Sequence, residues 1–257
     1  MNRSTVVTPI VALDFASRDA ALAMVDLLGD RCDYFKVGSE LFTVAGPPIV
    51  TELIARGKRV FLDLKFHDIP NTVEHAAAAA AALGASILTV HASGGERMVR
   101  AGVLGAASAG TGCEVFAVTV LTSLSMVERA AIMGLDAGTP GTRGGPDAPQ
   151  SLGSGAVGEA SLAADVLRLA GIAERADATG VVCSGHEAPA IRERFGDRLK
   201  LLVPGVRLPG SAPGDQIRVV TPAAAARAGA SYVILGRTVT GSADPAGAMD
   251  QAVASLG

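Results

Sequence analysis

The fold of this chain is decided by the stretch Phe61-Leu62-Asp63-Leu64-Lys65-Phe66-His67-Asp68-Ile69-Pro70-Asn71-Thr72. The apolar pattern of residues 59–65 predicts a strand, and the alanine-rich segment 73–83 predicts a helix after it. Proline lacks the N–H that a strand ladder needs, so Pro70 separates the two elements. Asn71 and Glu74 have the spacing of a capping box, which is typical of a helix start. The stretch therefore predicts one strand–turn–helix unit.

Three charged side chains lie at the end of this predicted strand. Asp63 and Lys65 are two residues apart, so their side chains point to the same face, and Asp68 follows just before the turn. Charged side chains are rarely buried unless they are paired. Asp63 and Lys65 alone are compatible with an ordinary salt bridge at a strand end. The third charge favours a functional site.

The composition indicates a globular protein that works away from membranes and nucleic acids. Of the 257 residues 49% are hydrophobic, but no apolar run approaches the roughly 18 residues of a membrane-spanning helix. The first residues lead into a predicted strand rather than a signal peptide, so we expect a cytoplasmic location. The net charge of −3 offers no basic field for nucleic acid. The three widely spaced cysteines predict neither a disulfide framework nor a structural zinc site.

Short apolar runs recur along the chain, and a segment with helical character follows most of them. The predicted strands are 8–13, 34–37, 59–65, 86–91, 115–120, 180–183, 200–203 and 232–235. The predicted helices include 17–28, 40–56, 73–83, a helix that ends near 107, 162–169, 187–195 and 245–256. Eight such units in this length match a (β/α)₈ TIM barrel, here a single domain over residues 1–257. A doubly wound sheet is the alternative, and the lack of a Gly-x-Gly-x-x-Gly turn after the first strand weakens it.

One segment interrupts the pattern. Residues 134–158 contain eight glycines and three prolines with little apolar material. A long stretch of this kind is unusual inside a compact domain. We interpret it as an excursion at the end of the fifth strand, and a linker without functional consequence is favoured over a lid.

Polar residues recur where the predicted strands end, which is where TIM barrels place their active sites. Asp14, Lys36, Asp63 and Lys65 could form an array of alternating charge across neighbouring strands. A lysine flanked by carboxylates is held protonated, because nearby opposite charge favours the charged form. Such a lysine is an acid or an electrostatic anchor, whereas a Schiff-base lysine must be neutral. The array therefore predicts proton donation to carbon or stabilisation of a carbanion.

The ends of the seventh and eighth strands suggest a phosphate site. Arg207 follows Pro204-Gly205-Val206, and Arg237 follows Gly236. Glycine lets backbone N–H groups approach an anion, and arginine can grip it with two hydrogen bonds. Gln216 lies beyond the glycine-rich loop after the seventh strand, where its amide could bridge a phosphate and a polar ring. The alternative for either arginine is a solvated side chain at a helix start.

The four histidines carry less information. His67 and His186 have no partners at metal-ligand spacing, so we predict no functional role for them. His91 ends the fourth strand, where it could contact either a neighbouring residue or a substrate.

The stretch from Asp63 to Thr72 resembles the signature of the orotidine 5′-phosphate decarboxylase family, whose members complete UMP synthesis. Further matching motifs follow in order, namely Ala12-Leu13-Asp14, Lys36-Val37-Gly38, Leu121-Thr122-Ser123, Val203-Pro204-Gly205-Val206-Arg207, Gly214-Asp215-Gln216 and Gly236-Arg237. Other phosphate-binding barrels share the Asp-x-Lys-x-x-Asp element, whereas the Asp-Ile-Pro-Asn-Thr and Gly-Asp-Gln motifs are more specific. The resemblance covers nearly the whole chain, and segment 134–158 is longer than expected for bacterial members.

The resemblance implies a role for each matching residue. Lys65 would protonate C6 of the pyrimidine as carbon dioxide leaves, and Asp63 would lie beside the departing carboxylate. Asp14 and Lys36 would contact the ribose. The implied catalytic residues are Lys65, Asp63, Asp68 and Lys36. The implied substrate-binding residues are Asp14, Lys36, Asp63, Asp68, Ile69, Thr72, Thr122, Ser123, Arg207, Gln216, Gly236 and Arg237.

The resemblance also implies an assembly and a ligand set. Asp68 and Thr72 would reach into the active site of a partner subunit, which makes the protein a homodimer with sites at its interface. Thr122 and Ser123 would lie by the pyrimidine edge, while Arg207, Gln216, Gly236 and Arg237 would hold the phosphate. Neither a metal nor an organic cofactor is implied. Two alternatives stay open: a metal-dependent sugar-phosphate decarboxylase or aldolase on the same barrel, and a non-catalytic nucleotide-binding barrel.

Overall fold

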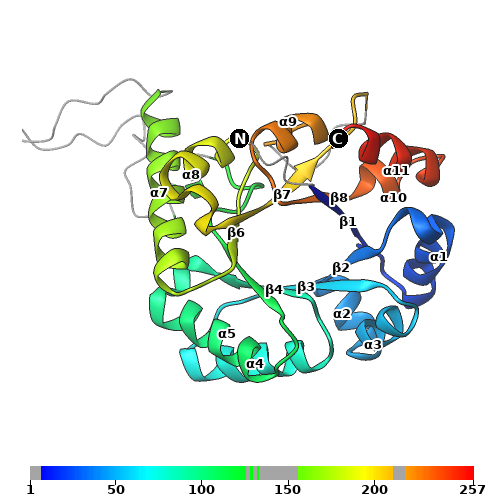
Figure 1. Ribbon diagram of the computed structural model, residues 1–257, viewed down its shortest axis with the longest axis horizontal. Helices are drawn as coiled ribbons and strands as arrows, with labels where there is room; N and C mark the ends of the chain where they lie inside the picture. Colours follow the sequence, from blue (N-terminus) through cyan, green and yellow to red (C-terminus); the bar gives the residue numbers. More distant parts are fainter. Residues whose placement is uncertain (1–6, 126–127, 130–131, 133–155, 211–217) are drawn as a thin grey trace, which may run out of the picture.

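Eight parallel strands close into a barrel in the computed structural model, and helices surround them (Figure 1). The structure describes residues 7–125, 128–129, 132, 156–210 and 218–257. Each strand pairs in parallel with its sequence neighbours, and β8 pairs with β1. The barrel predicted from sequence is therefore confirmed, and the doubly wound sheet is excluded. The strands are β1 (Thr8–Ala12), β2 (Tyr34–Gly38), β3 (Arg59–Phe66), β4 (Ile87–His91), β5 (Glu114–Val118), β6 (Gly180–Val182), β7 (Lys200–Val206) and β8 (Tyr232–Leu235).

The helices cover the outside of the barrel, because each crossover between parallel strands returns over the sheet. The α-helices are α1 (Arg18–Leu28), α2 (Ser39–Ala45), α3 (Pro48–Ala55), α4 (Pro70–Ala82), α5 (Glu96–Ser108), α7 (Ala156–Arg175), α8 (Ala188–Phe195), α9 (Pro222–Arg227), α10 (Arg237–Thr240) and α11 (Pro245–Ala254). Short 3₁₀ turns are η1 (Gly29–Arg31), η2 (Ala92–Gly94) and η3 (Gly196–Arg198). No helix in the described part of the chain is long and apolar enough to cross a membrane.

Two apolar layers hold the barrel together. The larger layer lies between strands and helices and includes Phe35 and Leu62. The smaller layer fills the barrel interior and includes Phe61 and Tyr34, whose ring packs edge-on against that of Tyr232 at 6.1 Å. Because strand side chains alternate, Phe61 and Asp63 belong to the inward face of β3 while Leu62 belongs to the outward face. The barrel interior is thus apolar around Phe61 and becomes polar at the carboxyl ends of the strands, where Asp63 lies.

Two predicted helix boundaries were wrong, and proline is the reason in both cases. The predicted helix over 40–56 is two helices, because α2 ends at Ala45, its C-cap Gly46 has a φ of 65°, and Pro48 occupies the first turn of α3. The predicted helix 73–83 begins earlier, at Pro70, where proline also suits the first turn. Ile69 is its N-cap and contributes no side-chain cap, so the predicted capping box of Asn71 and Glu74 is wrong.

Other boundaries differ in ways that matter less for the site. Helix α7 starts at Ala156 rather than 162, so the end of the predicted 134–158 excursion is helical. The rest of that predicted excursion lies outside the described residues. Helices α9 and α10 were not predicted, because they are only 6 and 4 residues long. Strand β7 continues to Val206, three residues past its predicted end.

Candidate active site

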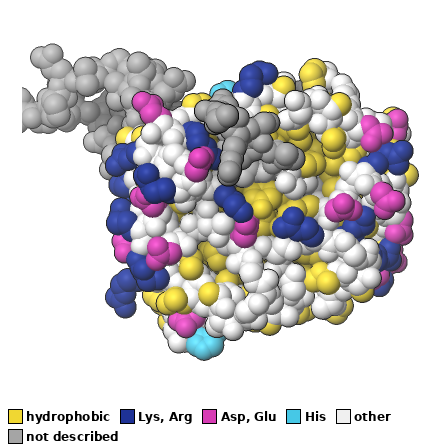
Figure 2. Space-filling view, viewed as in Figure 1, with side chains coloured by type: hydrophobic (Ala, Val, Ile, Leu, Met, Phe, Trp, Pro, Cys, Tyr) yellow, Lys and Arg dark blue, Asp and Glu magenta, His cyan; other side chains and the backbone are white. Residues whose placement is uncertain are grey.

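A cavity of about 600 Å³ opens at the carboxyl ends of the strands. Its walls come from seven of the eight strands or the residues that follow them, which is the arrangement expected of a TIM-barrel active site. On the face drawn in Figure 2, apolar side chains gather near the middle with acidic and basic side chains beside them. The predicted site residues that line the cavity are Asp14, Lys36, Asp63, Lys65, Thr122, Ser123, Arg207, Gly236 and Arg237.

The structure brings the four predicted charges into one chain of ion pairs. Lys36 Nζ donates to Asp14 Oδ1 at 2.7 Å and lies 3.9 Å from Asp63 Oδ2. Lys65 Nζ donates to that same Asp63 Oδ2 at 2.8 Å. Negative and positive groups therefore alternate along β1, β2 and β3 in the order Asp14, Lys36, Asp63, Lys65.

The inner pair of this array is buried and the outer pair faces the cavity. The side chains of Lys36 and Asp63 are 10% and 11% exposed, whereas those of Lys65 and Asp14 are 36% and 57% exposed. Burying a charge is costly unless it is paired and hydrogen-bonded, and removing one member of a buried pair typically costs about 3–5 kcal/mol. The array is therefore held in place at a cost in stability, and its outer members are available to a ligand.

Gly38 makes room for the array. It follows Lys36 at the end of β2, and a Cβ atom there would lie 2.9 Å from Lys36 Nζ and 3.3 Å from Asp14 Oδ1. Those distances are shorter than ordinary van der Waals contact, so a larger residue would displace the ammonium or the carboxylate. The Lys36-Val37-Gly38 motif thus has a steric explanation.

Lys65 has an unusual backbone conformation. Its φ is +50°, and it is one of two non-glycine residues with a positive φ in the described part of the chain. The pairing between β3 and β4 shifts in register between Leu62 and Phe66, so the bulge lies at the functional end of β3. Strained backbone of this kind costs on the order of 1–3 kcal/mol and clusters at functional sites. Sequence periodicity assumes a regular strand and does not reveal it.

Two polar contacts of the site were not predicted from the sequence. The Thr89 hydroxyl of β4 donates to Asp63 Oδ1 at 2.9 Å. Arg218 donates to buried Glu187 and to the Leu121 carbonyl at 3.0 Å, which braces the chain just before Thr122. The available signal was weak, since Thr89 was a single hydroxyl in an apolar strand and Arg218 was one arginine among many.

His91 lies beside the array but outside the cavity lining. Its ring is 5.4 Å from that of His67, and the two planes are tilted by 32°. Burial lowers the pKa of His91, and the neighbouring His67 and Lys65 lower it further. His91 therefore packs against a neighbouring ring and does not face the cavity. Of the two options left by the sequence, the structure favours this one over contact with a substrate.

The predicted phosphate end lies across the same cavity. Arg207 follows β7, and Gly236-Arg237 lies where β8 passes into α10. The Leu208 N–H donates to Thr238 Oγ1 at 3.0 Å, which ties the segment after Arg207 to α10. Gln216 lies outside the described residues, so its predicted place in the site is not described.

Three predicted site residues do not line the cavity of their own chain. Asp68, Ile69 and Thr72 are exposed, and Ile69 is 65% exposed although it is apolar. Asp68 Oδ1 accepts a hydrogen bond from the Ile69 N–H at 2.6 Å, which shapes the turn before α4. These residues are near β3 in sequence, but the turn carries them to the outer surface.

The ammonium groups of the site suit anions and a carbanion, which they can stabilise or protonate. Each carboxylate of the array is paired with a lysine ammonium. Within the described ranges, no group of three or more His, Cys, Asp or Glu side chains could hold a metal ion.

Comparison with known proteins gives one consistent result. Residues 8–140 and 148–252 match the model of the orotidine 5′-phosphate decarboxylase / HUMPS family. An orotidine 5′-phosphate decarboxylase of Anaeromyxobacter dehalogenans is 46% identical over 245 residues, which cover 95% of this chain and 96% of the relative. The Escherichia fergusonii decarboxylase is 44% identical over 248 residues, covering 96% and 91%.

Solved structures agree with these relatives. The crystal structure of orotidine 5′-phosphate decarboxylase from Lactobacillus acidophilus superimposes with a TM-score of 0.77 at 32% identity, covering 97% of this chain and 99% of that one. An uncharacterised conserved protein from Geobacillus kaustophilus superimposes with a TM-score of 0.73 at 31% identity, covering 97% and 100%.

Proposed function

The chain belongs to the orotidine 5′-phosphate decarboxylase / HUMPS family, and on that premise we propose that it converts orotidine 5′-phosphate to UMP and carbon dioxide in pyrimidine biosynthesis. The observation that carries the proposal is the array of Asp14, Lys36, Asp63 and Lys65 in the same cavity as Arg207 and Arg237. The array suits the reacting carbon, and the arginines suit a phosphate.

The proposed chemistry follows from the charges. When the bond between C6 and the carboxylate breaks, carbon dioxide leaves and the electron pair stays on C6. Preorganised charges stabilise such a carbanion because they need no reorganisation during the reaction. Lys65 Nζ then gives its proton to C6, forming the C–H bond of UMP, and regains a proton from solvent. This route uses the protein's own charges and requires no metal or organic cofactor.

Asp63 has a second role in this proposal. It holds the Lys65 ammonium by a 2.8 Å hydrogen bond, and it would lie beside the substrate carboxylate. Two carboxylates in a partly dry site repel each other, and this repulsion ends when carbon dioxide leaves. Asp63 therefore raises the free energy of the bound substrate relative to the products. It does not itself transfer the proton that Lys65 gives to C6.

The phosphate would bind remote from the bond that breaks. Arg207 and Arg237 would grip it from the ends of β7 and β8, with Gly236 letting the backbone approach. Thr122 and Ser123 would lie by the pyrimidine edge. Binding energy from the remote phosphate can be used to hold the pyrimidine against the array. Gln216 is a further proposed phosphate contact, and its amide would also lie near the base.

A homodimer with sites at its interface is part of the proposal. Asp68, Ile69 and Thr72 are exposed and lie outside their own cavity, which supports a role toward a second subunit. Mixing Lys65→Ala dimers with Asp68→Ala dimers tests this, because subunit exchange would create hybrid dimers with one intact site. We expect each variant alone to be nearly inactive and the mixture to recover turnover. A mixture that stays inactive although mass spectrometry detects hybrids would contradict a shared site.

The function is tested by turnover of orotidine 5′-phosphate in excess chelator, with carbon dioxide release as the readout. Sustained turnover is expected. Turnover that requires an added divalent metal would favour a metal-dependent sugar-phosphate enzyme. Tight UMP binding without any turnover would favour a non-catalytic nucleotide-binding barrel. The cytoplasmic location expected from sequence stays a prediction.

A further inference from the structure

Thr89 lies opposite the bulge in β3. The paired residues on either side of the bulge are Leu62 with Leu88 and Phe66 with Val90. Between them β3 has the three residues 63–65, whereas β4 has only Thr89. The residues that bulge out of the ladder are therefore the ones that carry the carboxylate and the ammonium of the array.

One hydroxyl group takes the place of the interrupted ladder. Thr89 Oγ1 accepts a hydrogen bond from the Lys65 N–H at 3.0 Å and donates its own hydrogen to Asp63 Oδ1 at 2.9 Å. Thr89 is fully buried, so water does not compete for these bonds. A hydroxyl has a single hydrogen to donate, and here the carboxylate receives it.

These two bonds act on the two groups that the proposed mechanism uses. The Lys65 backbone is held at a φ of +50°, a conformation that a lysine rarely adopts. Asp63 Oδ1 is engaged by Thr89, which leaves Oδ2 to receive the Lys65 ammonium at 2.8 Å. The direction of the ammonium thus depends on the backbone at Lys65 and on the orientation of one carboxylate, and Thr89 contacts both.

We propose that Thr89 is a positioning residue that sets the Lys65 ammonium and the Asp63 carboxylate in register for the reaction. The inference rests on the proposed decarboxylase function. Thr89 does not line the cavity, so it acts through Asp63 and Lys65 and does not touch the substrate.

Another buried threonine provides a matched control. The Thr119 hydroxyl, just after β5, donates to the Val182 carbonyl at 2.8 Å and does not line the cavity. This hydrogen bond satisfies a backbone carbonyl of β6, which is not part of the array. Replacing Thr119 removes a buried hydroxyl just as replacing Thr89 does, but leaves the reacting groups alone.

The test compares Thr89→Val, Thr89→Ser and Thr119→Val by steady-state kinetics. Valine keeps the shape and removes the hydroxyl, so we expect kcat of Thr89→Val to fall at least about tenfold with KM changed less than about threefold. Thr89→Ser keeps the hydroxyl and should stay within about threefold of wild-type kcat, as should Thr119→Val. A Thr89→Val variant with wild-type kcat, or a Thr119→Val variant with the same loss of kcat, would overturn the proposal.

A second pair of variants covers the case in which valine prevents folding. Thr89→Ser and Thr89→Ala both lose the methyl group and differ only in the hydroxyl, so a tenfold gap in kcat between them is expected. Equal kcat values for serine and alanine would refute the positioning role.

A readout without substrate separates this inference from the function it rests on. Because the Lys65 amide donates to Thr89, we expect hydrogen exchange at Lys65 to become at least about tenfold faster in Thr89→Val than in wild type. An unchanged exchange rate would contradict the proposal even if the enzyme is active. An inactive wild-type protein would instead refute the proposed function, while faster exchange in the variant would still support the contact.

Discussion

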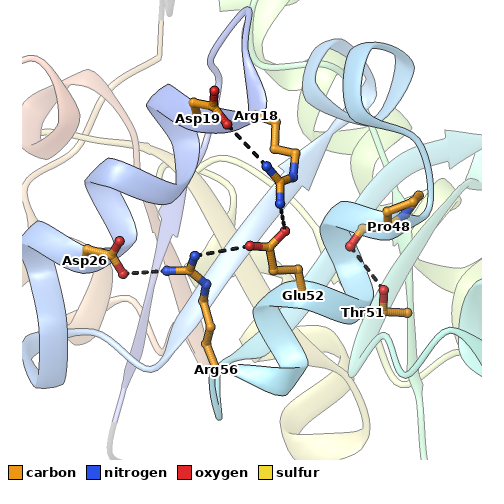
Figure 3. A network of polar contacts seen from close by, with 7 residues as sticks. All are labelled: Arg18, Asp19, Asp26, Pro48, Thr51, Glu52 and Arg56. Carbon is orange, nitrogen blue, oxygen red and sulfur yellow. Dashed lines mark hydrogen bonds and ion pairs between the residues drawn. The ribbon is translucent and has the colours of Figure 1, made fainter.

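Two networks of alternating charge lie near β1, β2 and β3. One is on the outside of the barrel and the other is in the cavity. The first joins α1 to α3 on the outside of the barrel, where Arg18 and Arg56 both bind Glu52 (Figure 3). Asp19 and Asp26 complete it, at 3.2 Å from Arg18 and 2.5 Å from Arg56. The second is the array of the cavity, with contacts of 2.7–3.9 Å. Distance alone does not distinguish the two.

Exposure distinguishes them. In the outer network the carboxylates of Asp19 and Asp26 are 92% and 67% exposed, whereas Asp63 at the centre of the array is 11% exposed. Water and salt screen the outer charges, so those side chains can leave and return at little cost. The inner charges of the array, Lys36 and Asp63, have no such freedom, since either one would be buried without a partner if the other were removed.

The comparison teaches that ion pairs become functional through burial and backbone support. The outer network lies on α1, on α3 and on Arg56, the C-cap of α3, and none of its residues has a positive φ. The array has a glycine that makes room, a positive φ at Lys65 and a buried threonine beneath it. The outer network is therefore expected to affect stability slightly and catalysis not at all.

The largest expected effect comes from removing Lys65, the proposed proton donor of the array. Lys65→Ala should lower turnover by at least about four orders of magnitude, because both the proton donor and a fixed positive charge are lost. Binding of UMP should be largely retained, since its phosphate and ribose contacts remain. Turnover and isothermal titration measure the two quantities.

Lys58→Ala is a control for that experiment at the opposite end of the same strand. Lys58 is also mostly buried, and its Nζ donates to the Gly29 carbonyl at 2.7 Å. Its loss should lower the melting temperature and leave kcat near the wild-type value. Near-wild-type turnover in Lys65→Ala would refute the assigned role.

A smaller effect is expected at the phosphate end. Arg237 is exposed at the cavity, so Arg237→Ala should weaken UMP binding by about 1.5–3 kcal/mol through loss of charge-assisted hydrogen bonds. Uridine, which lacks the phosphate, should bind equally to both proteins. Arg227→Ala removes an equal charge from α9 outside the cavity lining and serves as the control. Unchanged UMP affinity would remove Arg237 from the phosphate site.

The smallest effect is expected in the outer network. Although partial desolvation opposes it, hydrogen bonds from Arg18 and Arg56 lower the pKa of Glu52. A carboxyl with a lowered pKa in the folded state stabilises the protein above its unfolded pKa, and this contribution is lost as pH falls through the folded value. Glu52→Gln should therefore lower the melting temperature at pH 7 by no more than about 2 °C, and the difference should vanish as pH falls from about 5 to about 3.

Thermal melts of Glu52→Gln with and without 1 M salt check the same point, because salt should remove the difference at pH 7. Asp19→Asn, at the most exposed carboxylate of the network, should match wild type. A change of kcat in Glu52→Gln would contradict the expected difference between the two networks, since it would link the outer network to the cavity.

Much of the site was predictable because barrels place strand ends together. Asp14, Lys36, Asp63 and Lys65 were found by reading the residue types at those ends, and the structure brings them into one chain of contacts. Arg207 and Arg237 were found in the same way. Asp68, Ile69 and Thr72 show the limit, since proximity in sequence did not place them in the cavity.

By itself, the sequence determined the strands, the order of the barrel and the charges at its mouth, because side-chain periodicity and residue type are local properties. Only the tertiary structure decided that Thr89 lies beneath Asp63, that β3 bulges at Lys65 and that α4 begins at Pro70. The bulge and the contacts of Thr89 depend on pairing between β3 and β4, which joins residues 24 to 26 positions apart. A contact at that separation leaves no periodic trace in either strand, so it becomes visible only when the barrel closes.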